Sequence, residues 1–66
     1  MSENKFTISE WRRLKNISQE KLAEICGVHI NTIRYWEQKP SIIKIVDAEK
    51  LAEAFGVTLE NIIFLP

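Results

Sequence analysis

Apolar side chains recur every three or four positions along most of this 66-residue chain, with polar residues between them. Such spacing is typical of amphipathic helices, whereas half-buried strands alternate every second residue. The segment Ile-Ile-Lys-Ile-Val has a strand-like composition, but the chain offers it no partner strand. We therefore expect an all-α fold, a compact bundle of about five short helices. The pattern places these helices over residues 8–15, 19–26, 30–38, 45–55 and 59–64.

Residues that favour the first turn of a helix precede most of these segments. Thr7 with Glu10 three positions later predicts a capping box, in which each side chain binds the backbone N–H of the other residue. Ser18 and Thr58 are predicted N-caps of the same kind. His29 occupies the equivalent place before residues 30–38, although His is a poor cap. Such exceptions to local preference tend to fall at functional positions.

Residues 19–38 have the pattern of a helix-turn-helix. Gly27 stands between the two predicted helices, where a left-handed conformation without steric cost permits a sharp turn. A unit of this kind places its second helix in the DNA major groove, which indicates a DNA-binding module. Five apolar residues fall on its inner faces: Leu22, Cys26, Val28, Ile33 and Trp36. The other helices supply further expected core positions: Ile8, Trp11, Leu14, Ala48, Leu51, Ala52 and Phe55.

With these residues in place, the chain resembles the Cro and lambda-repressor-like helix-turn-helix family, also called the XRE family, over roughly residues 8–63. The resemblance implies a lambda-repressor-like DNA-binding domain whose members usually bind palindromic operators as dimers. One departure is Gln38-Lys39-Pro40, where the family often has Asn-Gly after the Glu. The residues that carry the resemblance are Arg12, Ile17–Glu20, Leu22–Ala23, Gly27–Val28, Ile33, Trp36–Glu37, Leu51–Ala52 and Phe55–Val57.

The resemblance also implies roles for single residues. Gln19 matches a residue that contacts the DNA backbone and braces the recognition helix, at a helix N-terminus suited to phosphate. Arg12 and Glu37 match a salt bridge that ties the first helix to the end of the third. Lys39 is an expected backbone contact. The DNA-facing positions of the recognition helix are matched by His29, Ile30, Asn31, Arg34, Tyr35 and Gln38.

Each of these side chains has a chemistry for DNA and an alternative. Arg34 can make two bonds to guanine, or pair with a nearby Glu on its own helix. Asn31 can make two bonds to adenine, or contact a phosphate. Ile30 offers an apolar contact to a thymine methyl, or packs on the preceding helix. Tyr35 suits a phosphate or a methyl, and His29 suits a phosphate or solvent.

The last residues are more apolar than one small core requires. Ile63, Phe64 and Leu65 are therefore expected at the interface of a two-fold homodimer, with simple closure of the core as the alternative. A two-fold dimer agrees with a palindromic operator, because the symmetry of the site mirrors that of the protein.

The net charge is zero, but the charges are unevenly distributed. Residues 1–45 carry eight basic and five acidic residues, a net charge of +3, whereas residues 46–66 carry one basic and four acidic residues, a net charge of −3. An acidic C-terminal part would face away from phosphate. The small positive charge predicts modest non-specific affinity for DNA, because few phosphates are neutralised.

Several other classes of protein are disfavoured. An enzyme is not expected, since the chain has one His, no Ser/His/Asp set and no phosphate-binding loop. Cys26 is the single cysteine and has no partner at metal-ligand spacing, so we expect no disulfide, metal or cofactor. There is no apolar run of the roughly 18 residues that span a membrane, and no signal-peptide pattern, which favours the cytoplasm.

We therefore expect one helix-turn-helix domain over residues 1–66, with its motif at 19–38, that binds double-stranded operator DNA as a homodimer. The short length favours a Cro-like transcriptional repressor of the kind found in phages and mobile elements. The alternative is a protein-interaction or antitoxin-like module with the same fold. It would bind a partner protein through Ile42–Val46 and the apolar C-terminal residues.

Overall fold

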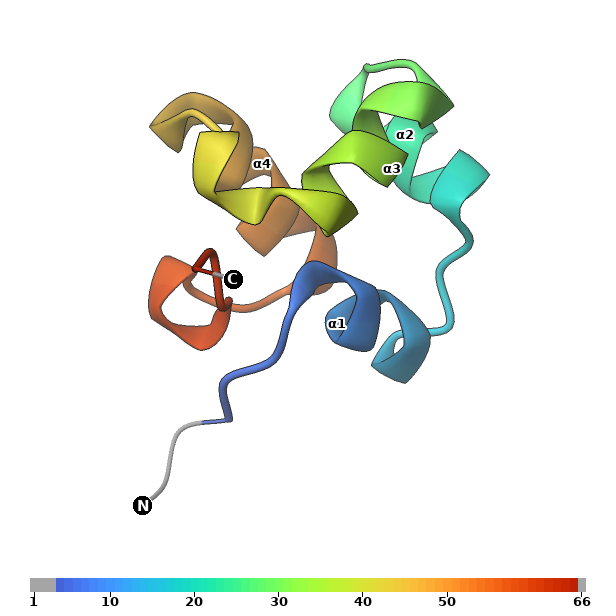
Figure 1. The fold of residues 1–66 in the computed structure, drawn as a ribbon. Helices are drawn as coiled ribbons and strands as arrows, with labels where there is room; N and C mark the ends of the chain where they lie inside the picture. Colours follow the sequence, from blue (N-terminus) through green and yellow to red (C-terminus); the bar gives the residue numbers. More distant parts are fainter. Residues whose placement is uncertain (1–3, 66) are drawn as a thin grey trace.

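Four α-helices and two 3₁₀ turns follow one another in a computed structural model, which describes residues 4–65 (Figure 1). The ends of the domain expected at 1–66, including Glu3 and Pro66, lie outside the described residues. The fold is all-α, as expected, and the first four helices lie within one residue of their predicted bounds. The elements are α1 (Ile8–Leu14), α2 (Gln19–Cys26), α3 (Ile30–Gln38), η1 (Pro40–Ile42), α4 (Ile45–Phe55) and η2 (Leu59–Asn61).

The predicted caps start the first three helices. At α1 the Thr7 hydroxyl accepts the Glu10 N–H at 3.2 Å, and the Glu10 carboxylate accepts the Thr7 N–H at 2.8 Å. At α2 the Ser18 hydroxyl accepts the Lys21 N–H at 3.0 Å. Before α3, His29 acts as a cap despite its poor propensity, because its Nδ1 accepts a backbone N–H of the first turn. Each cap satisfies a backbone donor that the helix itself leaves unpaired.

Left-handed residues end α2 and α4. Gly27 has φ +71° and Gly56 has φ +73°, as the sequence predicts for the turn of the motif. The chain reverses directly after each glycine, and the next N–H returns to the helix: Val28 donates to the Ala23 carbonyl at 3.0 Å. Asn16 also has a positive φ, +59°, between α1 and α2, a conformation that Asn tolerates better than most residues.

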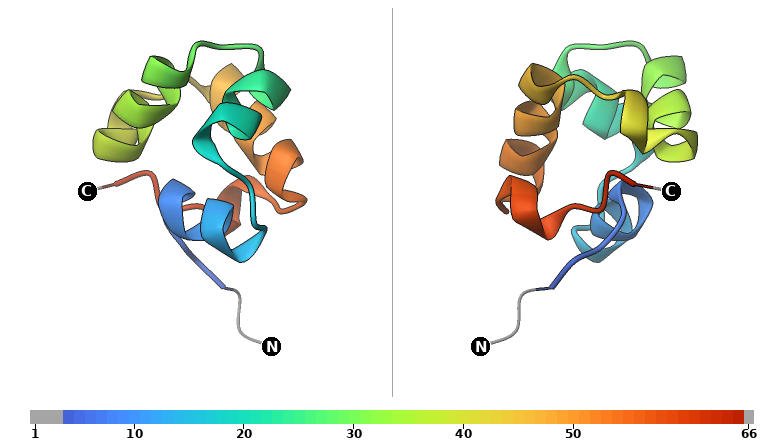
Figure 2. Two further views of the ribbon diagram at one scale, coloured as in Figure 1. Left: turned by 90° about the vertical axis from the view of Figure 1, so that its right-hand side faces the viewer. Right: turned by 60° about the vertical axis from the view of Figure 1, so that its left-hand side comes forward.

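The helices surround one apolar core (Figure 2). Trp11 lies near its edge, with its ring edge-on to Phe6 at 5.2 Å between centroids and stacked on Phe55 at 6.5 Å. The indole N–H of Trp11 donates to the Asn61 carbonyl at 2.7 Å, which satisfies its polar atom. The expected core positions are buried with the exception of Leu14, and Val28 packs against them half-buried. The core cluster is Ile8, Trp11, Leu22, Ala23, Cys26, Ile33, Trp36, Leu51, Ala52, Phe55 and Ile62.

Leu14 was expected to face inward, and that prediction is wrong, since 60% of its surface is exposed. Ile8 and Trp11 fill the side of α1 that faces the core, and Arg12 turns toward α3. Leu14 lies on a different side of the helix from Ile8, Trp11 and Arg12, because successive residues are about 100° apart around the axis. An apolar residue at helical spacing is buried only where another element lies opposite it.

The helix expected over 59–64 is also wrong. Only Leu59–Asn61 forms a turn, of the 3₁₀ type, and Ile62 is extended and makes a parallel bridge to Phe6. Phe6 N–H donates to the Asn61 carbonyl at 3.0 Å, and Ile63 N–H donates to the Phe6 carbonyl at 2.9 Å. An extended backbone makes these two bonds, which a helix would not allow, so pairing with the N-terminal segment replaces the last helix.

Candidate nucleic-acid interface

Helix α3 has one buried face and one exposed face. Ile33 and Trp36 point into the core, with 0% and 6% of their surfaces exposed. On the other side Asn31, Arg34 and Tyr35 are exposed, so that long polar side chains project from the helix into solvent. Helices α2 and α3 are joined by the turn at Gly27 and pack against each other. Together they form the helix-turn-helix that the sequence predicts.

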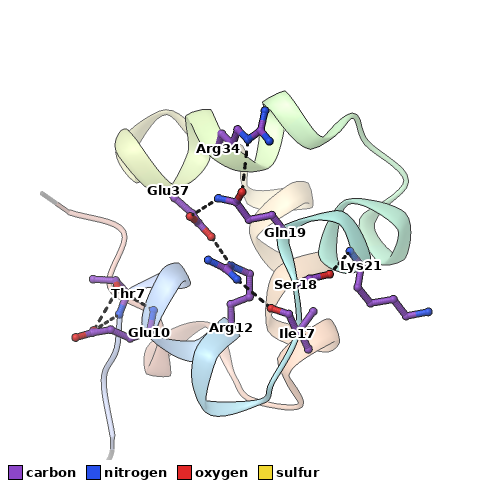
Figure 3. Close-up of polar contacts among 9 residues, drawn as sticks. All are labelled: Thr7, Glu10, Arg12, Ile17, Ser18, Gln19, Lys21, Arg34 and Glu37. Atoms are coloured by element: carbon purple, nitrogen blue, oxygen red, sulfur yellow. Dashed lines mark hydrogen bonds and ion pairs between the residues drawn. The ribbon is translucent and has the colours of Figure 1, made fainter.

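A series of hydrogen bonds connects α3 to α1 and α2 (Figure 3). Arg12 Nε donates to Glu37 Oε2 at 2.7 Å, and Arg12 Nη1 donates to the Ile17 carbonyl at 3.1 Å. Gln19 Nε2 donates to the other carboxylate oxygen, Glu37 Oε1, at 3.0 Å. Arg34 Nε then donates to Gln19 Oε1 at 3.4 Å, a long contact. This series of hydrogen bonds therefore reaches from the exposed face of α3 to the loop before α2.

The Arg12–Glu37 ion pair is the strongest contact in this series of hydrogen bonds. Only 16% and 12% of the two side chains are exposed, so water screens their attraction less than at an open surface. Both oxygens of Glu37 are hydrogen-bonded, which satisfies a charge that burial would otherwise make costly. The expected salt bridge is present, and it holds the end of α3 against α1 and the start of α2.

The expected DNA-facing residues differ in their exposure. His29, at the start of α3, and Gln38, at its end, are exposed, and Lys39 is the exposed residue that follows. Gln19 is half-buried at the first position of α2. Ile30 is also half-buried and packs against the core cluster, and its contact with a thymine methyl stays a prediction.

Two features of this surface were not predicted from the sequence. Arg34 makes no ion pair with Glu37; instead its Nη1 donates to Asn31 Oδ1 at 3.0 Å. The spacing of three residues along α3 signals such a contact. A hollow of about 340 Å³ also lies between the end of α1 and the start of α2, lined by Arg12, Arg13, Asn16, Ile17 and Ser18.

An apolar groove lies between η1, the start of α4 and the C-terminal segment. Its volume is about 240 Å³. Of the residues expected at a dimer interface, Ile63 and Phe64 are half-buried, and Phe64 packs against the core and lines the groove. Leu65 is 73% exposed at the rim. The groove is lined by Pro40, Ser41, Ile43, Ile45, Ala48, Leu59, Phe64 and Leu65.

The chemistry of the remaining ionisable groups is limited. Burial raises the pKa of the Cys26 thiol, so the nucleophilic thiolate is disfavoured. Within residues 4–65, the His, Cys, Asp and Glu side chains form no group of three that could hold a metal ion. No helix in this part of the chain has the length and apolar character that crossing a bilayer requires.

Comparison with known proteins agrees with this geometry. The family model HTH_3, described as helix-turn-helix, matches residues 8–62, from the first residue of α1 to the bridge at Ile62. Searches of curated proteins and of solved structures gave no match. This family consists of DNA-binding regulators that are generally not enzymes. The chain therefore belongs to the XRE-type helix-turn-helix family, is similar to Cro and the lambda repressor, and is a DNA-binding transcription regulator.

Proposed function

We propose that this protein is a sequence-specific repressor that binds a palindromic operator as a homodimer. The observation that carries the proposal is the exposed face of α3. Arg34, Asn31 and Tyr35 project from it, while Ile33 and Trp36 anchor the opposite face in the core. A recognition helix reads bases only if its backbone is held in a fixed orientation, and the Arg12–Glu37 pair supplies that constraint.

The bound DNA follows from where these residues lie. With α3 in the major groove, the start of α2 approaches the backbone, where its N-terminal dipole favours phosphate. Gln19 stands at that point, and Arg13 lines the hollow beside it. At the other end of α3, Gln38 and Lys39 are exposed. In the bound state they would face the opposite flank of the DNA major groove. We propose that these residues contact phosphates and that the exposed residues of α3 contact bases.

The apolar groove supports a homodimer. A two-fold interface must be self-complementary, so a groove and a side chain suited to fill it must both lie in the same patch. Leu65 is such a side chain, because it is exposed at the rim of the groove. Phe64 lines the groove beside it. In a symmetric pair, Leu65 of each copy would enter the groove of the other. The two recognition helices would then lie about 34 Å apart, one turn of DNA.

Repression is the simplest outcome of this binding, because a dimer seated on a promoter blocks the polymerase. In-vitro transcription from a promoter that carries the selected operator should fall as the protein is added. A rise in transcription would instead identify an activator. The cytoplasmic location predicted from the sequence stays a prediction, supported by the DNA-binding role of the family.

Selection of bound sites from random DNA duplexes tests the proposal. The selected sites should be inverted repeats with half-sites about 34 Å apart. Arg34→Ala should then weaken binding to the selected site by about 1–3 kcal/mol and leave most non-specific binding intact. Glu53→Ala, an exposed change on α4 far along the chain from α3, is the matched control and should bind normally. Equal losses on selected and random DNA would make Arg34 a phosphate contact.

A second function, a protein-interaction or antitoxin-like module, is favoured by one observation. Ile42, Ile45 and Val46 are 46%, 68% and 58% exposed, and they adjoin the groove around η1 and the start of α4. Clustered apolar side chains on a small domain mark an interaction site. If the protein selects no DNA duplex but forms a stable complex with another protein, that result would support this second function and contradict the first.

A further inference from the structure

The polar side chains around the start of α3 use their hydrogen-bond acceptors within the protein. His29 Nδ1 accepts the Asn31 backbone N–H at 3.1 Å. Asn31 Oδ1 accepts from Arg34 Nη1 at 3.0 Å, and Gln19 Oε1 accepts from Arg34 Nε at 3.4 Å. Three side chains therefore each use an acceptor atom in a contact within the protein, although the amide oxygens of Asn31 and Gln19 keep a second lone pair.

Several N–H groups of these side chains are left for a ligand. A neutral His ring that accepts at Nδ1 carries its proton on Nε2, so His29 offers an N–H. The Nδ2 group of Asn31 retains its two N–H bonds. A guanidinium has five N–H groups, and because two of those of Arg34 are engaged, three remain. These three are the two on Nη2 and one on Nη1, and a guanidinium can make parallel bonds from neighbouring N–H groups.

The orientation of the Gln19 amide is fixed by a charge. Its Nε2 donates to Glu37 Oε1, and Arg12 holds the same carboxylate through the other oxygen. A rotation of the amide by half a turn would place its oxygen against a carboxylate oxygen and its NH₂ against the Arg34 guanidinium. Both contacts would be repulsive, so Gln19 presents its oxygen to Arg34. Arg34 is therefore oriented from two sides, by Gln19 and by Asn31.

We infer that Arg34 reads guanine and that Asn31 is a positioning residue for Arg34, not a reader of adenine. The inference rests on the proposed DNA-binding function and deepens it. In the major groove guanine offers two acceptors, O6 and N7, which match the two remaining parallel donors of Arg34. Phosphate oxygens are acceptors as well and suit His29 and Gln19.

Adenine does not match this surface. Its major-groove edge combines the N7 acceptor with the N6 donor, and recognition by Asn needs the side-chain oxygen to accept from N6. In this structure Asn31 Oδ1 is already engaged by a charged donor, Arg34 Nη1. Reading adenine would require the same oxygen to accept a second bond while it still holds Arg34, so the two roles compete for one atom. The alternative role of Asn31 as an adenine contact is therefore disfavoured by its own neighbour.

Selection of DNA sites with three proteins tests the inference. The wild type should select guanine in each half-site, and Arg34→Ala should lose that preference by about 5- to 150-fold. Asn31→Ala should weaken the same guanine preference by roughly 2- to 10-fold, with no loss of preference at an adenine. If Asn31→Ala removes a preference for adenine and leaves guanine untouched, the inference is overturned.

A conservative variant separates positioning from contact. Asn31→Asp keeps an oxygen to accept from Arg34, so the guanine preference should survive, although overall affinity falls because a carboxylate repels phosphate. A double-mutant cycle of Asn31→Ala with Arg34→Ala should show coupling, because Asn31→Ala should have little further effect on guanine preference once Arg34→Ala is present. Additive losses would show that the two residues act independently and would contradict the inference.

Replacement of single base atoms provides a second readout. With 7-deazaguanine in the selected site, which lacks the N7 acceptor, the wild type should bind roughly 2- to 10-fold more weakly. Arg34→Ala should bind the normal and altered sites equally. Unchanged melting temperatures would exclude misfolding of any variant. A wild type that selects no duplex would contradict the proposed function itself, whereas specific binding without guanine would contradict only the inference.

Discussion

The helix-turn-helix of residues 19–38 and the C-terminal segment 56–65 differ in how their backbone is determined. In the first, both helices have their predicted bounds, and the cap at Ser18 and the left-handed Gly27 lie where local chemistry places them. The second carries equivalent signals, with Gly56 left-handed and Thr58 in a capping box. Even so, it forms one 3₁₀ turn and then an extended segment.

The difference shows that a start signal does not make a helix. A helix needs enough residues beyond its first turn to repay nucleation, and most of its stability comes from packing of an apolar face. Helices α2 and α3 pack against each other and against the core along their length. Residues 59–65 instead meet the N-terminal segment, where Phe6 offers both a donor and an acceptor to an extended chain.

The largest effect is expected from the buried isoleucines of the two regions. Ile33→Ala should destabilise the whole domain by about 2–5 kcal/mol, because loss of a fully buried side chain leaves a cavity in the core. Ile62→Ala, at the bridge to Phe6, should cost less and act mainly on residues 59–65. Urea unfolding gives the first cost and amide hydrogen exchange maps the second. If both variants lost hydrogen-exchange protection equally over the whole domain, the expected difference between the two regions would be contradicted.

The second effect concerns the ion pair that holds α3. Glu37→Ala should cost about 2–3 kcal/mol, because it removes the partner of a largely buried Arg12 and one partner of Gln19. Its operator affinity should fall further than its stability explains, since α3 loses a constraint. Glu37→Gln keeps one hydrogen bond and should be milder. A Glu37→Ala protein with normal melting temperature and operator binding would show that packing alone positions α3.

The two left-handed glycines give a matched third test. Gly27→Val and Gly56→Val should each cost about 1–3 kcal/mol, because φ is +71° and +73° and a β-branched residue is strained there. No atom lies within 4 Å of an added Cβ at either place, so strain and not collision sets the cost. Thermal melting should show similar losses. Only Gly27→Val should also reduce operator affinity of the folded protein, since that turn sets the angle of α3.

The fourth test concerns the groove beside the C-terminal segment. Leu65→Glu places a charge at an exposed rim position, so the monomer should keep its melting temperature at low concentration. The dimer, if Leu65 fills the partner's groove, should dissociate about tenfold more readily or more. Sedimentation with and without operator measures this. Glu49→Gln, an exposed change on α4, is the control, and an unaltered dimer in Leu65→Glu would place the interface elsewhere.

The smallest effect is the pH dependence due to Cys26. Burial raises the pKa of this thiol above its ordinary value of 9.0. Because the unfolded chain then ionises first, stability is fully present below pH 9.0 and declines as the pH rises above it. Cys26→Ala should remove this decline while costing some packing at all pH values. Urea midpoints at several pH values compare the two proteins, and parallel curves would contradict the effect.

The candidate site was largely predictable from the sequence, except for its internal bonding. The fold class and the exposed positions of α3 followed from residue types at fixed spacings, and the Arg12–Glu37 pair was implied by the family resemblance. The contact of Gln19 with Arg34 was not predicted, because it joins residues 15 positions apart on two helices. The contact of Asn31 with Arg34 was signalled by spacing, but a competing partner, Glu37, stood at the same distance along the helix.

The sequence by itself determined where α1 to α4 begin and end, since caps, glycines and the apolar period act within a few residues of one another. It also determined which side chains face the core in those helices, with Leu14 as the exception. Only the tertiary structure decided that residues 62–63 are extended and that Gln19 faces Arg34 with its oxygen. Both outcomes depend on partners distant in sequence, Phe6 for the backbone and Glu37 for the amide, which no local pattern specifies.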